Sequence, residues 1–325
     1  MIVPTSTAQR QATENDLLPP PEQVHERVWA VATSMPGDEH RLRYTLTYLL
    51  LDDDRRVHVV DPGWDTEENW STLLAAVDRV SAAGVGSIIA THLHPDHLGL
   101  AARLRAHTGA PVVLHEIESA ALAAMAAAPP PRVDDRWEVP AERLDEFAVL
   151  RVARESFKPI VPDLTVRGAG GTLDRPGLPI GWLHTPGHTR GHICLRLPGP
   201  RLLLTGDHVL PARYPGVGLG GRSATNPLAD YFDSLDLVRT FDDHEVLPGH
   251  HYRFRGLAER VGVIGAHHRR RNAQVAAILR RDPQASVYRV AEGLDWSAGW
   301  DRLRGFYLFS ALAQTAMHVD LLRRT

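Results

Sequence analysis

Residues 92–97 place three histidines and one aspartate within six positions, directly after a short apolar run. Imidazole nitrogens and carboxylate oxygens are ligands that zinc and neighbouring first-row metals accept. His92 and His94 stand two positions apart, so in extended backbone their side chains point the same way. Asp96 and His97 then face a second position. The stretch predicts a metal site at the end of a buried strand, for which the rest of the chain must supply further ligands.

The 325 residues are 43% hydrophobic and 23% charged, which suits one large soluble domain followed by a small one. The segment through Glu22 has neither the basic start nor the apolar core of a secretory signal, and no apolar run has the length of a membrane span. The single cysteine, Cys194, excludes an internal disulfide and fits a reducing compartment. We therefore expect a cytoplasmic protein without membrane contact, in which Cys194 packs inside a strand.

Strands that alternate with helices in two blocks predict an α/β fold in which two sheets pack face to face with helices outside. We expect a flexible arm over residues 1–25, the sandwich over 26–254 and a small helical domain over 255–325 that would suit a winged helix. A helical insertion at about 116–160 could be a lid or a packing appendage. It could also serve as the contact of a homodimer.

The local patterns also predict individual elements. A helix should follow a cap at Asp65 or Thr66, and a long helix should run from Leu257 to Leu279. The strands are expected at 28–32, 44–51, 57–60, 87–90, 111–114, 164–166, 180–184, 192–197, 201–205 and in a run that ends at Leu247.

The later strands each end in polar residues of the kind that a metal site requires. Small or turn-forming residues accompany them, so the backbone can approach closely. Side chains at the ends of strands are held on rigid elements, as a preorganised site needs. The residues in these positions are His184, His188 and His192 after the first strand, Asp207 and His208 after the second, and His250 and His251 after the last.

The motif His92-x-His94-x-Asp96-His97, followed by His188, Asp207 and His250, resembles the metal site of the metallo-β-lactamase superfamily, with Asp61 matching the acid that opens that pattern. The Thr-Pro-Gly-His-Thr-x-Gly-His wording is most similar to glyoxalase II and its hydrolase relatives. The helical C-terminus with His267-His268-Arg269 is similar to a subgroup whose sandwich is followed by a winged helix, including lactamase-beta-like-2 endoribonucleases. The resemblance implies a four-layer αββα sandwich and a hydrolase.

The resemblance also implies two divalent metal ions, with zinc preferred and iron or manganese as alternatives. His92, His94 and His188 would hold one ion, Asp96, His97 and His250 the other, and Asp207 would bridge them. Asp61, His184 and His192 would support these ligands from behind. A hydroxide between the ions would attack the substrate, and Asp96 would orient it and carry its proton to the leaving group. The bridging aspartate argues against β-lactamase activity.

The favoured substrate is a small thioester, ester or lactone. The insertion, with Trp137 and Phe147, could form an apolar pocket for an acyl group. Glyoxalase II binds glutathione partly through lysines, and Lys158 is the only lysine here, so a glutathione thioester is disfavoured. Tyr214, Arg222 and His251 are candidate substrate contacts.

The alternative is a nuclease or phosphodiesterase. From His251 to Arg281 the chain has eight arginines and one acid, Glu259. These arginines could bind the phosphates of RNA, or they could pair with the acidic sandwich within the molecule. No aromatic stacking platform is interleaved with them, so nucleic acid is the less favoured partner.

Overall fold

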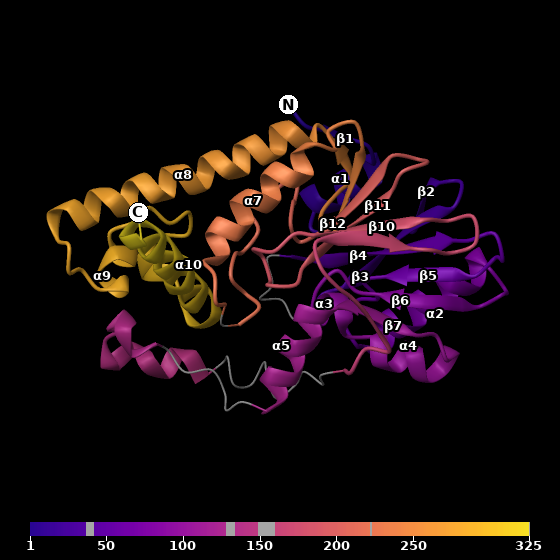
Figure 1. Cartoon of the computed structure of the whole chain (residues 1–325), viewed down its shortest axis with the longest axis horizontal. Coiled ribbons are helices and arrows are strands. Elements are labelled where there is room, and N and C mark those ends of the chain that lie inside the picture. The colour runs from indigo at the N-terminus through magenta and orange to yellow at the C-terminus, as the bar shows by residue number, and fades with distance from the viewer. Residues whose placement is uncertain (37–41, 128–133, 149–159, 222, 325) are drawn as a thin grey trace.

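The computed structural model describes the chain apart from residues 37–41, 128–133, 149–159, 222 and 325. Two seven-stranded sheets pack face to face, helices cover their outer faces, and the C-terminal helices stand to one side (Figure 1). The predicted α/β sandwich with C-terminal helices is therefore confirmed. No helix of the described residues is both long and apolar enough to cross a bilayer.

One sheet brings the end of β5 beside the end of β6. β5 pairs with β6 in parallel, as do β6 with β7 and β7 with β8, whereas the pairs from β2 to β5 are antiparallel. Residues that follow Val60 and Ile89 therefore meet at one edge. The strands, in spatial order, are β2 (Glu22–His25), β3 (Val28–Ser34), β4 (Tyr44–Leu51), β5 (Val57–Val60), β6 (Val85–Ile89), β7 (Val112–His115) and β8 (Leu164–Val166).

The other sheet has one parallel pair, β12 with β13, so the residues that follow these two strands also meet at one edge. The remaining pairs are antiparallel. Its strands, in spatial order, are β1 (Val3–Pro4), β14 (Phe254–Arg255), β13 (Glu245–Pro248), β12 (Leu202–Gly206), β11 (Ile193–Leu197), β10 (Ile180–His184) and β9 (Gly170–Leu173).

β4 shows why the core strands read as continuous apolar runs. All eight of its residues are buried. Leu46 and Leu50 belong to the cluster between the sheets, and Leu49 belongs to the cluster beneath the helices. Since successive side chains point to opposite faces and both faces are covered, polar alternation has no place here. Each such leucine contributes about 1.5–3 kcal/mol by leaving water.

The helices cover both sheets. α2 begins as expected at Thr66, whose Oγ1 accepts a hydrogen bond from the Asn69 amide at 3.1 Å. α2, α4 and α5 pack on the first sheet, and α7 and α8 pack on the second. The helices are α1 (Thr7–Glu14), α2 (Glu67–Val80), α3 (Pro95–Leu98), α4 (Ala101–Thr108), α5 (Glu116–Ala127), α7 (Pro227–Arg239), α8 (Leu257–Arg281), α9 (Val287–Glu292) and α10 (Gly305–Arg324), with short 3₁₀ turns η1 (Asp135–Trp137), η2 (Ala141–Phe147) and η3 (Trp300–Arg302).

The N-terminal segment 1–25 differs from the expected flexible arm. β1 pairs with β14 and β2 pairs with β3, and α1 follows β1 and precedes β2 in the chain. Arg253, which is buried, holds the segment in place by donating hydrogen bonds to Glu22 and to Glu245. The segment is therefore part of the sandwich, because its backbone is paired and a buried ion pair ties it down.

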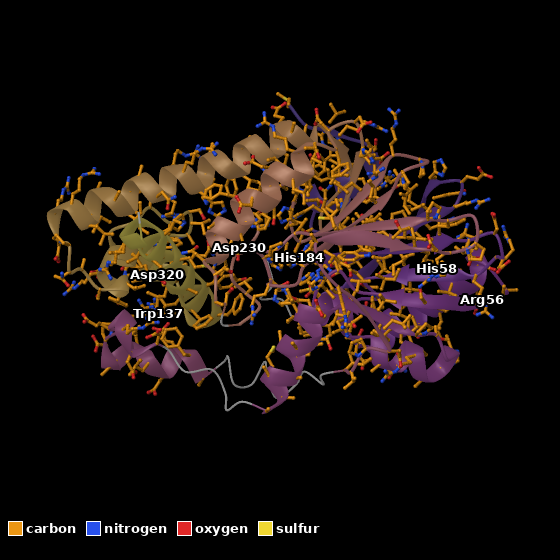
Figure 2. The ribbon with its side chains drawn as sticks, viewed as in Figure 1. Arg56, His58, Trp137, His184, Asp230 and Asp320 are labelled. Atoms are coloured by element: carbon orange, nitrogen blue, oxygen red, sulfur yellow. The ribbon has the colours of Figure 1, made fainter. Side chains whose placement is uncertain are left out.

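The C-terminal residues 256–324 differ from the expected winged helix. They form α8, α9, η3 and α10 and contain no strand, so they lack the hairpin that makes a wing. The insertion packs against these helices: the ring centroids of Trp137 and Phe147 lie 5.6 and 6.4 Å from that of Phe309 on α10. Figure 2 shows Trp137 beside the C-terminal helices. The two rings therefore belong to a helical core and not to the acyl pocket that the sequence suggested.

Candidate metal centre

Seven histidine and aspartate side chains meet where the two sheets present their strand ends. They form two groups, and within each group one ligand atom per residue lies within 4.8 Å of the others. Asp96, His97 and His250 form the second group, and their residues are all buried. The first group is made of His92, His94, His188 and Asp207.

The atoms of the first group converge closely. His92 Nε2 and His188 Nε2 lie 2.9 and 3.1 Å from His94 Nδ1. The Oδ2 atom of Asp207 lies 3.6 Å from His188 Nε2. Burial, aided by the neighbouring imidazoles, lowers the pKa of His188 to about 4 and that of His92 well below its usual range. These rings are therefore neutral at pH 7, which is the form that binds a metal.

The second group shares Asp207 with the first. Asp207 Oδ1 lies 3.4 Å from His97 Nε2 and 3.3 Å from His250 Nε2, and Asp96 Oδ2 lies 3.4 and 3.2 Å from the same two nitrogens. Among the described residues, these two nitrogens and Asp207 Oδ1 are buried without a hydrogen-bond partner. Buried polar atoms are costly unless they have partners. A divalent cation would satisfy all three, so the residues fit a metal.

The carboxylates of Asp96 and Asp207 favour positive charge in the second group. Burial opposes charge on the rings of His97 and His250, but Asp96 and Asp207 outweigh it, raising the pKa of His250 to about 10 and that of His97 well above its usual range. Burial likewise opposes charge on Asp96 and Asp207, but the two imidazoles hold their pKa well below the ordinary range. A dication at this position would replace the protons on the rings.

Backbone carbonyls fix the orientation of three rings. His188 Nδ1 donates to Gly216 O and His250 Nδ1 donates to Tyr44 O, both at 2.7 Å. His94 Nε2 donates to Leu219 O at 3.2 Å. Because a carbonyl only accepts, the outer nitrogen of each ring carries a proton and the inner nitrogen is the one available to a metal, which in His250 would replace the second proton.

Asp61 orients the other two rings, as the resemblance implied. Its carboxylate accepts hydrogen bonds from the amide and hydroxyl of Thr91 and from His97 Nδ1, at 2.7–2.8 Å. Because the Thr91 hydroxyl donates its hydrogen bond to Asp61, its oxygen accepts a hydrogen bond from His92 Nδ1 at 2.9 Å. Asp61 is buried at a φ of +52°, a strained conformation for a residue with a side chain that such a network can hold in place.

Glycine is required where the two edges meet. A Cβ on Gly249 would lie 2.7 Å from both Asp207 Oδ1 and His97 Cε1. Any larger residue here would push the second group of ligands apart. The turn after β13 therefore needs glycine so that His250 can reach the same centre as Asp207.

The remaining predicted residues lie around the centre. His184 stacks on His115 at 4.4 Å and donates to Arg190 O, so it supports the loop that carries His188. His192 Nδ1 lies 2.9 Å from the hydroxyl of Thr185. Neither histidine belongs to the two groups of candidate ligands.

The candidate substrate contacts differ from one another. Tyr214 stacks on His267 of α8 at 3.9 Å, so it connects its loop to the C-terminal helices. Arg222 lies outside the described residues. His251 is buried and lines a cavity beside the centre.

Glu118 on α5 has a role that the sequence did not suggest. It is fully buried, and its two oxygens accept hydrogen bonds from the backbone amides of Leu93 at 2.8 Å and Gly191 at 2.6 Å. It therefore joins the loop that carries His92 and His94 to the loop that carries His188. Burial raises its pKa to about 7. The one signal in the sequence is an acid within an alanine-rich helix, a pattern that is usually a solvated face.

The two-sheet sandwich and the clustered imidazoles and carboxylates define an α/β protein with a candidate metal centre. The model of the metallo-beta-lactamase superfamily matches residues 40–250, and the chain belongs to this superfamily. Two of the relatives are named as a hydrolase and a thioesterase, in agreement with the prediction of a hydrolase.

Curated relatives include the beta-lactamase-like protein 2 homolog of Caenorhabditis elegans, which is 23% identical over 86% of this chain and 80% of its own length. A hydroxyacylglutathione hydrolase of Haemophilus influenzae is 26% identical over 62% of this chain and 83% of its own. An atrochrysone carboxyl ACP thioesterase of Aspergillus fumigatus is 23% identical over 75% of this chain, which spans 46% of that protein.

The similarity to solved structures covers more of the chain than residues 40–250, which the superfamily model matches. A metallo-beta-lactamase family protein from Thermus thermophilus has a TM-score of 0.71 at 25% identity, over 93% of this chain and 95% of its own. A beta-lactamase domain protein from Burkholderia ambifaria has a TM-score of 0.70, also at 25% identity, over 93% of this chain and 88% of its own. Both alignments span most of the chain, so they reach into the C-terminal helices as well as the sandwich.

Proposed function

We propose that the protein is a hydrolase with two divalent metal ions that cleaves a small thioester, ester or lactone. The observation that carries this proposal is the position of Asp207, whose Oδ2 lies beside His188 Nε2 while its Oδ1 lies beside His97 and His250. One carboxylate thus offers an oxygen to each group of candidate ligands. His92, His94 and His188 would hold one ion, Asp96, His97 and His250 the other, and Asp207 would bridge them.

The bound ions would polarise the substrate carbonyl and lower the pKa of water toward neutrality. Asp96 is the candidate catalytic residue. Its Oδ2 lies 3.4 Å from the Thr45 hydroxyl and beside the imidazoles of His97 and His250, so the carboxylate is fixed in position. From there it can orient the attacking water and pass a proton to the leaving group. Asp61 and Glu118 would keep the ligands in place during turnover.

A small acyl substrate is supported by the relatives and by the size of the cavity. Two relatives act on acyl compounds according to their names, one as an ACP thioesterase and the other as a hydroxyacylglutathione hydrolase. The cavity beside His250 has a volume of about 320 Å³, which is room for about ten water-sized groups. Such a cavity suits a short acyl chain better than a nucleic acid.

The nuclease alternative loses support because three of the arginines in residues 251–281 make contacts within the molecule. Arg253 pairs with Glu22 and Glu245, Arg255 lies 3.8 Å from Glu245, and Arg260 is buried and donates to backbone carbonyls. The ion pairs of Arg253 and Arg255 are of the intramolecular kind that the sequence left open. The cytoplasmic location, the homodimer and the identity of the metal remain predictions.

The test is a substrate panel with the full chain, loaded with zinc, manganese or iron. It contains an acyl thioester, a lactone, bis-p-nitrophenyl phosphate and single-stranded RNA. We expect metal-dependent cleavage of the thioester or lactone, abolished by a chelator and restored by metal. Cleavage of RNA with a steep dependence on salt, without cleavage of the acyl substrates, would contradict the proposal.

A further inference from the structure

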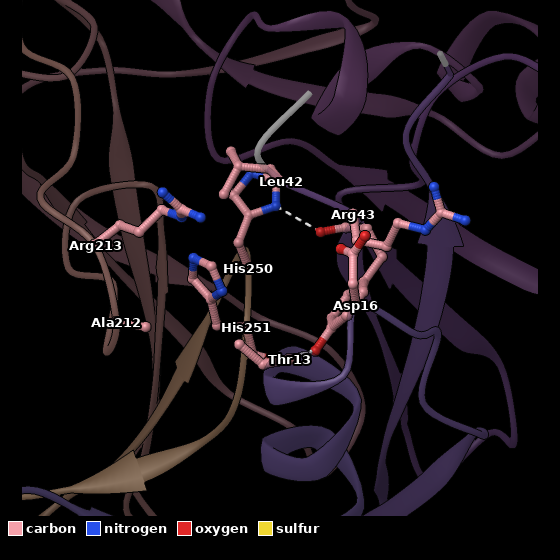
Figure 3. A pocket seen from close by; sticks show the side chains of 9 residues that line it. Thr13, Asp16, Leu42, Arg43, Ala212, Arg213, His250 and His251 are labelled. Atoms are coloured by element: carbon pink, nitrogen blue, oxygen red, sulfur yellow. Dashed lines mark hydrogen bonds between the residues drawn. The ribbon is translucent and has the colours of Figure 1, made fainter. Parts of the chain in front are cut away.

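The cavity beside the metal centre has walls from parts of the chain that are far apart in sequence. His250 and His251 follow β13, Ala212 and Arg213 follow β12, and residues 42–44 lead into β4. Thr13 of α1 and Asp16 complete the lining. Figure 3 shows Arg213 and His251 on one side of the cavity and Thr13, Asp16 and Arg43 on the other. Because His250 belongs to the candidate centre, a molecule in this cavity would lie next to the reacting atoms.

His251 lines this cavity with its backbone in a strained conformation. Its φ is +72°, a left-handed conformation that residues with a side chain rarely adopt. The hydroxyl of Tyr44 donates to its carbonyl at 2.6 Å and so fixes the backbone. The turn allows His250 to face the metal centre while the next ring lines the cavity. His251 is only 7% exposed, and in the described part of the chain its Nε2 is buried without a partner.

A buried ring nitrogen beside a cavity requires a partner from inside it. The Nε2 atom of an imidazole can donate or accept one hydrogen bond, according to the tautomer. Arg213 lines the same cavity, and Figure 3 shows its side chain on the same side as the ring of His251. The molecule that fills the cavity should therefore offer a polar group to both side chains.

The charges of the lining indicate the sign of that group. Arg43 and Arg213 are two cations, and Asp16 is the one carboxylate. Arginine presents a planar fork of donors that matches a carboxylate or a phosphate. Thr13 and Asp16 precede the residues that match the superfamily model, so one wall of the cavity comes from outside the matched range.

We propose that this cavity binds an anionic group of the substrate, a carboxylate or a phosphate, through Arg213 and His251. This inference rests on the proposed hydrolase, and it narrows the substrate to an acyl compound that carries a negative charge a few bonds from the scissile bond. The volume of about 320 Å³ leaves room for an acyl chain of a few carbons together with that group.

The experiment compares matched thioesters with the zinc-loaded full chain. A pentanoyl thioester is neutral, its glutaryl counterpart adds a carboxylate to the acyl part, and a third compound carries a phosphate on the leaving thiol. Wild-type protein should prefer one of the charged substrates by kcat/KM, and the position of the preferred charge distinguishes carboxylate from phosphate. R213Q should reduce this preference about tenfold or more, and R213K should restore part of it.

R239Q is the control, because Arg239 is an exposed arginine in the last turn of α7 and is not among the residues that line the cavity. Binding provides a second measurement that does not need turnover. Glutarate and methyl phosphate are titrated calorimetrically into wild-type and R213Q protein, and pentanoate corrects for a carboxylate bound at the metals. At least one of the two anions should bind more tightly than pentanoate, and R213Q should lose the difference.

The failure of this inference differs from the failure of the proposed function. If wild-type protein cleaves neutral and charged thioesters equally, or if R213Q leaves the preference unchanged, the inference is wrong while the hydrolase stands. If no thioester is cleaved but an anion binds in an Arg213-dependent way, the proposed substrate class is wrong while the anion site stands. If no thioester is cleaved and no anion binds in an Arg213-dependent way, the proposed function and this inference are both wrong.

Discussion

Replacement of Glu118 by alanine would leave the backbone amides of Leu93 and Gly191 without their acceptor. A buried donor that loses its partner costs about 1–3 kcal/mol, so two of them predict a loss of about 2–6 kcal/mol in the free energy of unfolding. The loops that carry His92, His94 and His188 would also lose their connection. We expect zinc to bind about 10- to 100-fold more weakly, as when other supporting partners of ligands are removed.

The assay is urea unfolding of the metal-free chain at pH 5, where Glu118 is protonated in the folded chain and the cost of burying its charge does not enter. Zinc affinity is measured at neutral pH by competition with a chelator. The matched control is Glu116→Ala, because Glu116 lies on the same helix but is only half-buried, and it lies 3.5 Å from the exposed Arg167. Its loss should cost less than about 1 kcal/mol. If Glu118→Ala behaves like Glu116→Ala in both measurements, Glu118 does not support the ligand loops and the reasoning is refuted.

Four further outcomes are expected. The pKa of Glu118 is about 7 in the folded chain and 4.5 ordinarily, so between these pH values the folded chain holds a proton that the unfolded chain releases. The free energy of unfolding of the metal-free protein should therefore fall by about 3 kcal/mol relative to Glu118→Gln as the pH rises from 4.5 to 7. Parallel pH profiles of the two proteins would contradict this. Asp96→Ala should lower kcat by orders of magnitude more than it weakens substrate binding, and an unchanged kcat with metals still bound would refute its catalytic role. Burial raises the pKa of Cys194 to about 12, so a thiol reagent should label it only after unfolding; rapid labelling of the native chain would place it elsewhere. Removal of metal should lower the midpoint of thermal unfolding. Relative to protein kept at a free metal concentration of a thousand times Kd, the free energy of unfolding should fall by about 4 kcal/mol. An unchanged midpoint would argue against a bound metal.

Strands with a local signal were predictable. β4, β5, β8 and β10 coincide with the predicted ranges, and β4 and β5 are buried along their whole length, as their apolar runs indicated. The His/Asp motif is also local in sequence, and the structure brings its members together with His188, Asp207 and His250.

Elements that depend on distant partners were not predictable in the same way. β1 has two residues and exists because it pairs with β14, some 250 positions later. β9 begins with two glycines and is held only by β10. α7 is a helix that the sequence analysis did not predict. In each case the tertiary partner, and not the local pattern, decides the structure.

The supporting contacts of the site follow the same division. Asp61 came from the motif, whereas Glu118 acts through hydrogen bonds to amides 25 and 73 positions away. Nothing in the composition of α5 distinguishes such an acid from a solvated one. The C-terminal helices illustrate the converse error, since residues 255–325 suited a winged helix although residues 256–324 contain no hairpin.

The central claim is that Asp207 joins two metal positions, and metal content tests it most directly. Elemental analysis of the zinc-loaded chain after removal of free metal should give two ions per chain. Asp207→Ala should give one or fewer, whereas Asp230→Ala should keep two, because Asp230 lies in the first turn of α7, accepts a hydrogen bond from Thr225 and belongs to neither group of candidate ligands. One ion per wild-type chain, or two ions retained in Asp207→Ala, would contradict the account.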